Sequence, residues 1–256
     1  MCGIVGYVGV GTSAQLRKAT HALARRGPDD EGFYEAPGVG FGFRRLSIID
    51  LQGGHQPLSN AEKTIWVMLN GEIYNYRFLR ELLEREGAVF TTHSDTEVIV
   101  HGYAHWGERV FTRLEGMFAI AVWDARQARL LLARDRLGKK PLYYSPQGHV
   151  TWFASEPKAL LVAHVLSREI NHQALLAYFH TDAVPTPLSI WRDLCVLPPA
   201  SFIVIEGARV SEPHVFWQLE VQTRHDLLPR EAVGLLQASV DQAVKDRLSA
   251  DVPLGL

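Results

Sequence analysis

The chain begins Met1-Cys2-Gly3-Ile4-Val5-Gly6-Tyr7-Val8-Gly9, which places a thiol beside the N-terminus and follows it with small and apolar residues. Residues 3–9 predict a strand that holds this end of the chain rigidly in a sheet. If Met1 is removed, Cys2 carries a free α-amino group, whose ordinary pKa near ~7.7 to 8.0 lets it act as a base toward the thiol. The stretch therefore predicts an N-terminal cysteine nucleophile. The alternative is a small buried residue at the start of a strand.

The composition is that of a soluble globular protein with one large domain, or one domain and part of another. Of 256 residues, 47% are hydrophobic and 21% are charged, and the formal net charge is -2. No basic run, membrane-length apolar segment or signal peptide occurs, so we expect a cytoplasmic protein with no nucleic-acid or membrane partner. Cys195 is expected to be a buried structural thiol, and the 11 scattered histidines predict no metal site.

Two segments offer hydrogen-bond donors after predicted strands. Arg44-Arg45 follows the strand at 39–43, and the planar fork of donors of one of these arginines suits a carboxylate, although a surface ion pair explains it equally well. Asn70-Gly71 follows the apolar strand at 64–69. It is either a hairpin turn, or a side-chain amide and a backbone N–H that together hold an oxyanion.

A third segment, Ser94-Asp95-Thr96-Glu97, has the form of a capping box, with Ser94 as the N-cap of a helix and Glu97 three residues later. The cap does not require Asp95, whose carboxylate is placed to meet an ammonium group. We expect other helices at 14–26 and 75–86, and a hairpin of buried strands at 117–124 and 128–134. The charges of Asp135 to Lys140 are assigned to loops without a catalytic role.

These residues together resemble the class II, N-terminal-nucleophile type of glutamine amidotransferase domain. Within that class the sequence motifs are similar to those of glutamine-hydrolysing asparagine synthetases. The matching motifs are Met1-Cys2-Gly3-Ile4, Arg26-Gly27-Pro28-Asp29, Arg45-Leu46-Ser47-Ile48-Ile49-Asp50, Asn70-Gly71-Glu72-Ile73-Tyr74-Asn75, Ser94-Asp95-Thr96-Glu97 and Arg134-Asp135-Arg136-Leu137-Gly138. The resemblance covers essentially the whole chain.

The resemblance implies a role for each site residue. Cys2 would attack the side-chain amide carbon of L-glutamine, with its own amine moving the proton. Asn70, through its side chain, and Gly71, through its backbone N–H, would form the oxyanion hole. At the far end of the substrate, Arg45 would bind the α-carboxylate and Glu72 and Asp95 the α-ammonium group, with backbone contacts from Ile48 and Ile49. This half of the enzyme would need no cofactor and no metal.

The resemblance also implies an α+β fold, the four-layer αββα sandwich of N-terminal-nucleophile hydrolases, over residues 1–160. A linker would span 161–228, and 229–256 would be the first helix of an incomplete α/β ATP-pyrophosphatase synthetase domain. In the family, a segment like Asp251-Val252-Pro253-Leu254-Gly255 leads into a loop that binds the pyrophosphate of ATP. ATP and Mg are therefore expected only in a synthetase domain C-terminal to this chain, where ammonia would amidate aspartate.

Two other functions remain open. The chain could serve an amidotransferase with a different carboxylate acceptor, in polysaccharide or natural-product biosynthesis. It could also be a non-catalytic interaction module that keeps Met1 and never exposes the thiol. A homodimer is a further expectation that the sequence leaves open.

Overall fold

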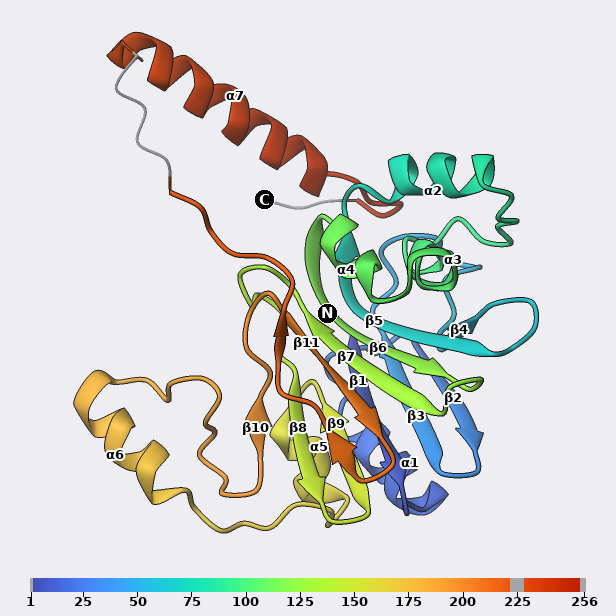
Figure 1. The fold of residues 1–256 in the computed structure, drawn as a ribbon, viewed down its shortest axis with the longest axis vertical. Coiled ribbons are helices and arrows are strands. Elements are labelled where there is room, and N and C mark those ends of the chain that lie inside the picture. Colours follow the sequence, from blue (N-terminus) through green and yellow to red (C-terminus); the bar gives the residue numbers. More distant parts are fainter. Residues whose placement is uncertain (1, 222–227, 254–256) are drawn as a thin grey trace.

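The computed structural model describes residues 2–221 and 228–253, whose strands form two antiparallel sheets (Figure 1). The first sheet has the order β10 (Cys195–Val196), β8 (Tyr143–Gln147), β9 (Val150–Ala154), β1 (Gly3–Gly9), β3 (Val39–Arg45) and β2 (Asp30–Ala36). The second has the order β12 (Arg209–Val210), β11 (Ser201–Glu206), β7 (Arg129–Arg134), β6 (Gly116–Asp124), β5 (Ile65–Ile73) and β4 (Leu58–Ser59), and β13 (His214–Val215) pairs with β11. The strand that follows Cys2 is thus an inner strand of the first sheet.

The helices lie outside the sheets (Figure 1). In chain order they are α1 (Ser13–His21), α2 (Tyr76–Arg85), α3 (Glu97–Trp106), the 3-10 turn η1 (Gly107–Arg109), α4 (Val110–Arg113), α5 (Pro157–Val162), α6 (His172–Thr181) and α7 (Pro229–Arg247). The helix expected at 14–26 is therefore shorter, and residues 22–26 continue it as turns. Along residues 2–221 and 228–253, none of the helices combines the length and apolar character that crossing a lipid bilayer requires.

The alternation of side chains along the strands creates the layers. In β1, Ile4 and Val8 face the core between the two sheets, whereas Val5 and Tyr7 face α1 and α5. In β5, Met68 faces the core between the sheets, and its neighbours face the helices on the other side. Because successive residues of a strand point to opposite faces, each sheet can bury both of its faces.

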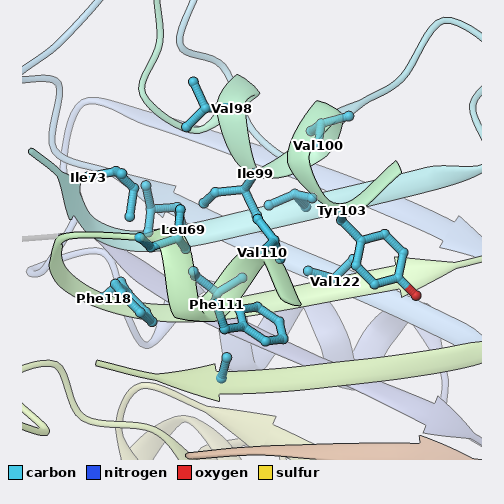
Figure 2. Packing of buried hydrophobic residues seen from close by; sticks show 14 of the residues in the cluster. Leu69, Ile73, Val98, Ile99, Val100, Tyr103, Val110, Phe111, Phe118 and Val122 are labelled. Carbon is cyan, nitrogen blue, oxygen red and sulfur yellow. The ribbon is translucent and has the colours of Figure 1, made fainter. Parts of the chain in front are cut away.

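Figure 2 shows the third core, where α3 and α4 pack on the second sheet. The labelled side chains are Leu69, Ile73, Val98, Ile99, Val100, Tyr103, Val110, Phe111, Phe118 and Val122. With this core, the order of layers is helices, sheet, sheet and helices. The predicted α+β class is confirmed.

The sheets extend beyond residue 160, into the range for which we expected a linker. β10 adds an edge to the first sheet, and β11 pairs along its whole length with β7 in the second. The half-buried Cys195 lies on β10, packed against the core between the sheets. The division of the chain into domains stays a prediction.

The last helix, α7, projects away from the sandwich (Figure 1). One apolar stripe of this helix is solvent-exposed, with each of its side chains more than half exposed: Val233, Leu236, Val240, Val244 and Leu248. At its C-terminal end the helix returns to the sandwich, where the Arg247 guanidinium carbon lies 4.9 Å from the centre of the Tyr74 ring.

Candidate active site

Cys2 lies at the entrance to β1, where neighbouring segments fix its backbone. Arg26 Nε donates a hydrogen bond to the Cys2 carbonyl (2.9 Å), and its Nη1 pairs with Glu156 at 2.9 Å. Two residues further on, the Ile4 N–H donates to Ser155 Oγ (3.1 Å), and the Ser155 N–H donates to the Ile4 carbonyl (2.9 Å). The expected rigid attachment of this end of the chain is confirmed from residue 2 onward. The predicted loss of Met1 lies outside the described residues.

The Cys2 thiol opens into a cavity of about 350 Å³. Every site residue named from the sequence lines it, namely Cys2, Arg45, Ile48, Ile49, Asn70, Gly71, Glu72 and Asp95. The thiol donates to the Leu46 carbonyl, with Sγ 3.7 Å from that oxygen. Burial raises the pKa of Cys2 above its usual value, and this hydrogen bond opposes the effect. The thiol therefore needs a base if it is to become a nucleophile at neutral pH.

Asn70 and Gly71 lie inside β5, so the hairpin turn that their sequence also allowed does not form. The ladder with β6 runs through both residues, which face Ala119 and Phe118. A Cβ atom on Gly71 would come within 2.0 Å of the Met117 carbonyl oxygen, so only glycine permits this close strand approach. Asn70 is fully buried, and its Nδ2 lies 3.4 Å from Ser155 Oγ. Its Oδ1 has no hydrogen-bond partner among the described residues.

Arg45 lies under the loop of residues 46–54 and holds it closed. Nη1 donates to the Leu51 carbonyl (3.1 Å), and Nη2 donates to the carbonyls of Ile49 (2.9 Å) and Asp50 (2.6 Å). The guanidinium group has five N–H donors, so it can anchor the loop and still face an anion in the cavity. Arg45 thereby positions Ile48 and Ile49 on the cavity wall.

Two segments outside the same loop, those of His93 and Asp251, also hold it in place. The Asp50 carboxylate accepts from the Gly53 N–H and from the His93 N–H, each at 2.8 Å, which ties the loop to the segment before α3. Beyond α7, Asp251 Oδ2 accepts from the Asp50 N–H (2.7 Å), and the Asp251 N–H donates to the Ile48 carbonyl (2.9 Å). A residue near the C-terminus thus contacts the wall of the Cys2 cavity. Residues 254–256 lie outside the described part.

The cavity contains two carboxyl groups with raised pKa values. Burial and, to a smaller extent, the nearby Glu72 raise the pKa of Asp95 to about 7, although its Oδ2 accepts a hydrogen bond from the Ile73 N–H (2.9 Å), which opposes the rise. Burial also raises the pKa of Glu72, and the positive charge of Lys140 opposes this effect. A cationic group bound between the two carboxyl groups would favour their ionised forms.

The capping box predicted at Ser94 to Glu97 is wrong. α3 begins at Glu97 itself, and Ser94 Oγ accepts from the Thr96 N–H (3.2 Å). The Glu97 carboxylate instead turns toward the preceding loop. There it accepts from the backbone N–H and the hydroxyl group of Thr91 and of Thr92, at distances of 2.6 to 3.0 Å. Glu97 therefore holds the loop that leads into Asp95.

Reasoning from the sequence assigned no role in the site to Lys140 or Ser155. Lys140, whose segment we had assigned to loops without a catalytic role, is buried and lines the cavity. Asp135 shapes that segment, since its carboxylate accepts from the N–H groups of Phe118, Leu137, Lys139 and Lys140. Ser155 lies between β1 and Asn70. No local sequence pattern connects either residue with Cys2.

No group of histidine, cysteine or carboxylate side chains is placed to bind a metal ion within residues 2–221 and 228–253. The cavity instead offers a thiol, hydrogen-bond donors on one strand and a pair of carboxyl groups. The arrangement is a four-layer α+β sandwich with this thiol at the entrance to its first strand, β1. Residues 1–217 match the family model described as the glutamine amidotransferase domain, and the chain belongs to this family.

The chain is similar in sequence to part of several longer proteins. The chain is 38% identical over 265 residues to asparagine synthetase [glutamine-hydrolyzing] 1 of Bacillus subtilis, covering 100% of this chain and 41% of that protein. It is 32% identical over 283 residues to a putative asparagine synthetase [glutamine-hydrolyzing] 2 of Methanocaldococcus jannaschii, covering 100% and 54%. The chain thus spans about half or less of the length of these curated relatives.

Solved structures support the fold. The allosteric regulatory enzyme of purine biosynthesis superposes with a TM-score of 0.64 at 19% identity, over 85% of this chain and 50% of that one. A glutamine phosphoribosylpyrophosphate amidotransferase from B. subtilis gives a TM-score of 0.60, also at 19% identity and with the same coverage. At this identity the similarity is one of fold.

Proposed function

We propose that this chain hydrolyses L-glutamine to glutamate and ammonia at Cys2. The observation that carries the proposal is the single cavity of about 350 Å³, in which a thiol, donors for an oxyanion and groups for both charged ends of an amino acid meet. The sequence family supports the same chemistry. Glutamine has one end that reacts and one zwitterionic end, and the two sides of the cavity match this division.

The reacting end would lie at Cys2. After loss of Met1, the free α-amine takes the thiol proton as sulfur attacks the amide carbon, and the C=O oxygen becomes an oxyanion. Donors from Asn70 and Gly71 stabilise this charge, an effect typically worth about 3 kcal/mol of barrier for one such donor. The protonated amine then returns the proton to nitrogen, the C–N bond breaks and ammonia leaves. Water hydrolyses the resulting thioester to glutamate and regenerates the thiol.

The zwitterionic end would lie against the two carboxyl groups and Arg45. The α-ammonium group favours ionisation of Asp95 and Glu72, and the α-carboxylate meets the remaining Arg45 donors. Backbone groups at Ile48 and Ile49 complete the wall. Because these contacts lie away from the scissile amide, they hold the zwitterionic end of glutamine before the chemical step and that of the glutamyl thioester after it.

We further propose that the ammonia serves a synthetase domain C-terminal to this chain, which amidates aspartate with ATP and Mg. The names and lengths of the relatives support this role. A second cavity of about 760 Å³ lies beside α7, and Met117 lines both this cavity and the Cys2 cavity. We place the sandwich and β10–β13 in one domain, α7 at the start of the next, and the whole protein in the cytoplasm.

The test combines intact mass with a glutamate-release assay. We expect the mature chain to lack Met1, to release glutamate and to gain one adduct on Cys2 from the glutamine analogue diazo-oxo-norleucine. Cys2→Ala should abolish release and labelling but keep glutamine binding, because the groups that hold the zwitterion are unchanged. Met1 retained, with no adduct and no glutamate release, would refute the proposal and favour a non-catalytic module.

A further inference from the structure

Ser155 joins the strand of the nucleophile to the strand of the oxyanion donors. It follows β9 directly, is fully buried, and exchanges hydrogen bonds with both backbone groups of Ile4, two residues after Cys2. On its other side its Oγ lies 3.4 Å from the Asn70 amide nitrogen. A serine hydroxyl group has one donor and two acceptor positions, so its partners can be counted.

The count leaves two buried groups without partners. Ser155 Oγ accepts from Ile4 N–H and from Asn70 Nδ2, which uses both acceptor positions. No acceptor for its hydroxyl hydrogen exists among residues 2–221 and 228–253. Asn70 Oδ1, buried on the other side of the amide, is likewise without a partner there. Buried polar groups without partners are costly and rare.

Rotating the Asn70 amide by 180° about its last side-chain bond satisfies both groups. The oxygen and nitrogen of an amide have nearly the same shape, so their hydrogen-bond partners decide which orientation is adopted. After rotation, the Ser155 hydroxyl group donates to Oδ1. Nδ2 then occupies the former position of the unpartnered oxygen, with an N–H free to donate in a side chain that lines the Cys2 cavity.

We infer that Ser155 is a positioning residue, whose hydroxyl group orients the Asn70 amide so that Nδ2 donates to the oxyanion formed at Cys2. This inference rests on the proposed glutamine hydrolysis and adds a residue to it. Ser155 does not touch the substrate. If Ser155 has no hydroxyl group, Asn70 Oδ1 loses the donor that holds it. The Asn70 amide can then adopt the orientation in which Oδ1, an acceptor, lies beside the oxyanion.

The test compares two ligands of the mature chain, which is the full sequence after loss of Met1. The γ-aldehyde analogue of glutamine adds the Cys2 sulfur to its carbonyl carbon, and the thiol proton passes to the resulting oxygen, which lies in the oxyanion hole. Glutamate, the product, forms no such adduct. In Ser155→Ala we expect kcat to fall about ten-fold and the inhibition constant of the aldehyde to rise about ten-fold, while that of glutamate stays within about two-fold.

Ser145→Ala is the matched control. Ser145 is also a fully buried serine, and its hydroxyl group donates to the Asp193 carbonyl, away from the cavity. The Ser145→Ala variant should lower the melting temperature as Ser155→Ala does. It should change neither kcat nor the ratio of the inhibition constants of the aldehyde and glutamate. A second arm places Ser155→Ala in an Asn70→Ala background, where kcat should fall no further, because the group that Ser155 orients is gone.

Equal losses of aldehyde and glutamate binding in Ser155→Ala, or an undiminished ten-fold effect in the Asn70→Ala background, would overturn the role of Ser155 alone. A wild-type chain that releases no glutamate would overturn both this role and the proposed function. An aldehyde-specific loss that disappears without Asn70 would support the inference.

Discussion

Glu97→Gln tests how the loop before α3 is stabilised. Burial by itself would raise the pKa of Glu97, but hydrogen bonds from His101, Thr92 and Thr91 outweigh it and lower the pKa to about 2. Compared with the ordinary value of 4.5, this corresponds to about 3 kcal/mol of folding free energy at pH 7. Its side chain is only 3% exposed, so solvent screens these contacts little. Glutamine removes the charge and turns an N–H toward the donors of Thr91 or Thr92.

The sign of the pH dependence follows from the lowered pKa. The contribution of Glu97 is complete well above pH 4.5 and declines as the pH falls toward 2, with about 2 kcal/mol lost by about pH 3. Urea unfolding should therefore find Glu97→Gln about 3 kcal/mol less stable at neutral pH, with a smaller difference in acid. Glu81→Gln, at a carboxylate 68% exposed on α2, is the control and should change the free energy of unfolding by less than about 0.5 kcal/mol. A Glu97→Gln difference that is the same at both pH values would refute the reasoning.

Three shorter predictions concern the cavity and its loop. Because the pKa of Asp95 is raised to about 7, glutamine binding to a chain without the nucleophilic thiol should weaken as the pH falls through 7; calorimetric titrations should show this dependence and its absence in Asp95→Asn. Gly71→Ala places a Cβ 2.0 Å from the Met117 carbonyl oxygen, so urea unfolding should show a loss of about 2 kcal/mol and glutamate release should fall sharply. The control is Gly234→Ala on α7, where the added Cβ meets open space, and it should lower neither the stability nor the glutamate release. Asp251→Ala removes the carboxylate that accepts from the Asp50 N–H in the cavity loop, and it should raise the glutamine KM about three-fold with kcat retained. An unchanged KM would contradict a role for this hydrogen bond.

Much of the fold can be read from local sequence patterns. The run of small and apolar residues at 3–9 predicted the strand β1, and the apolar stretches at 117–124 and 128–134 predicted the paired strands β6 and β7. These predictions succeed because the period of side-chain burial is a property of each strand by itself. The site residues were found mainly through the motifs of a family, since the chemistry of Arg45 or Asn70-Gly71 left a structural explanation equally open.

One local prediction failed, and one of two local alternatives was ruled out, because contacts with other segments were stronger. The turn preference of Asn70-Gly71 is weak beside a ladder in which all nine residues of β5 pair with β6. The capping box at Ser94 to Glu97 does not form, because the Glu97 carboxylate instead accepts hydrogen bonds from four donors of Thr91 and Thr92. In both cases the competing partners lie outside the window that defines the motif.

The sequence by itself determined the N-terminal thiol, the strand that fixes it and the residue types of the cavity. Only the tertiary structure decided that Lys140 and Ser155 lie around that cavity, and that a residue beyond α7 holds its loop. The physical reason is that strand periodicity acts between neighbours in the chain. Ser155 and Asn70 are 85 residues apart in sequence, and only the packing of the two sheets brings them within 3.4 Å.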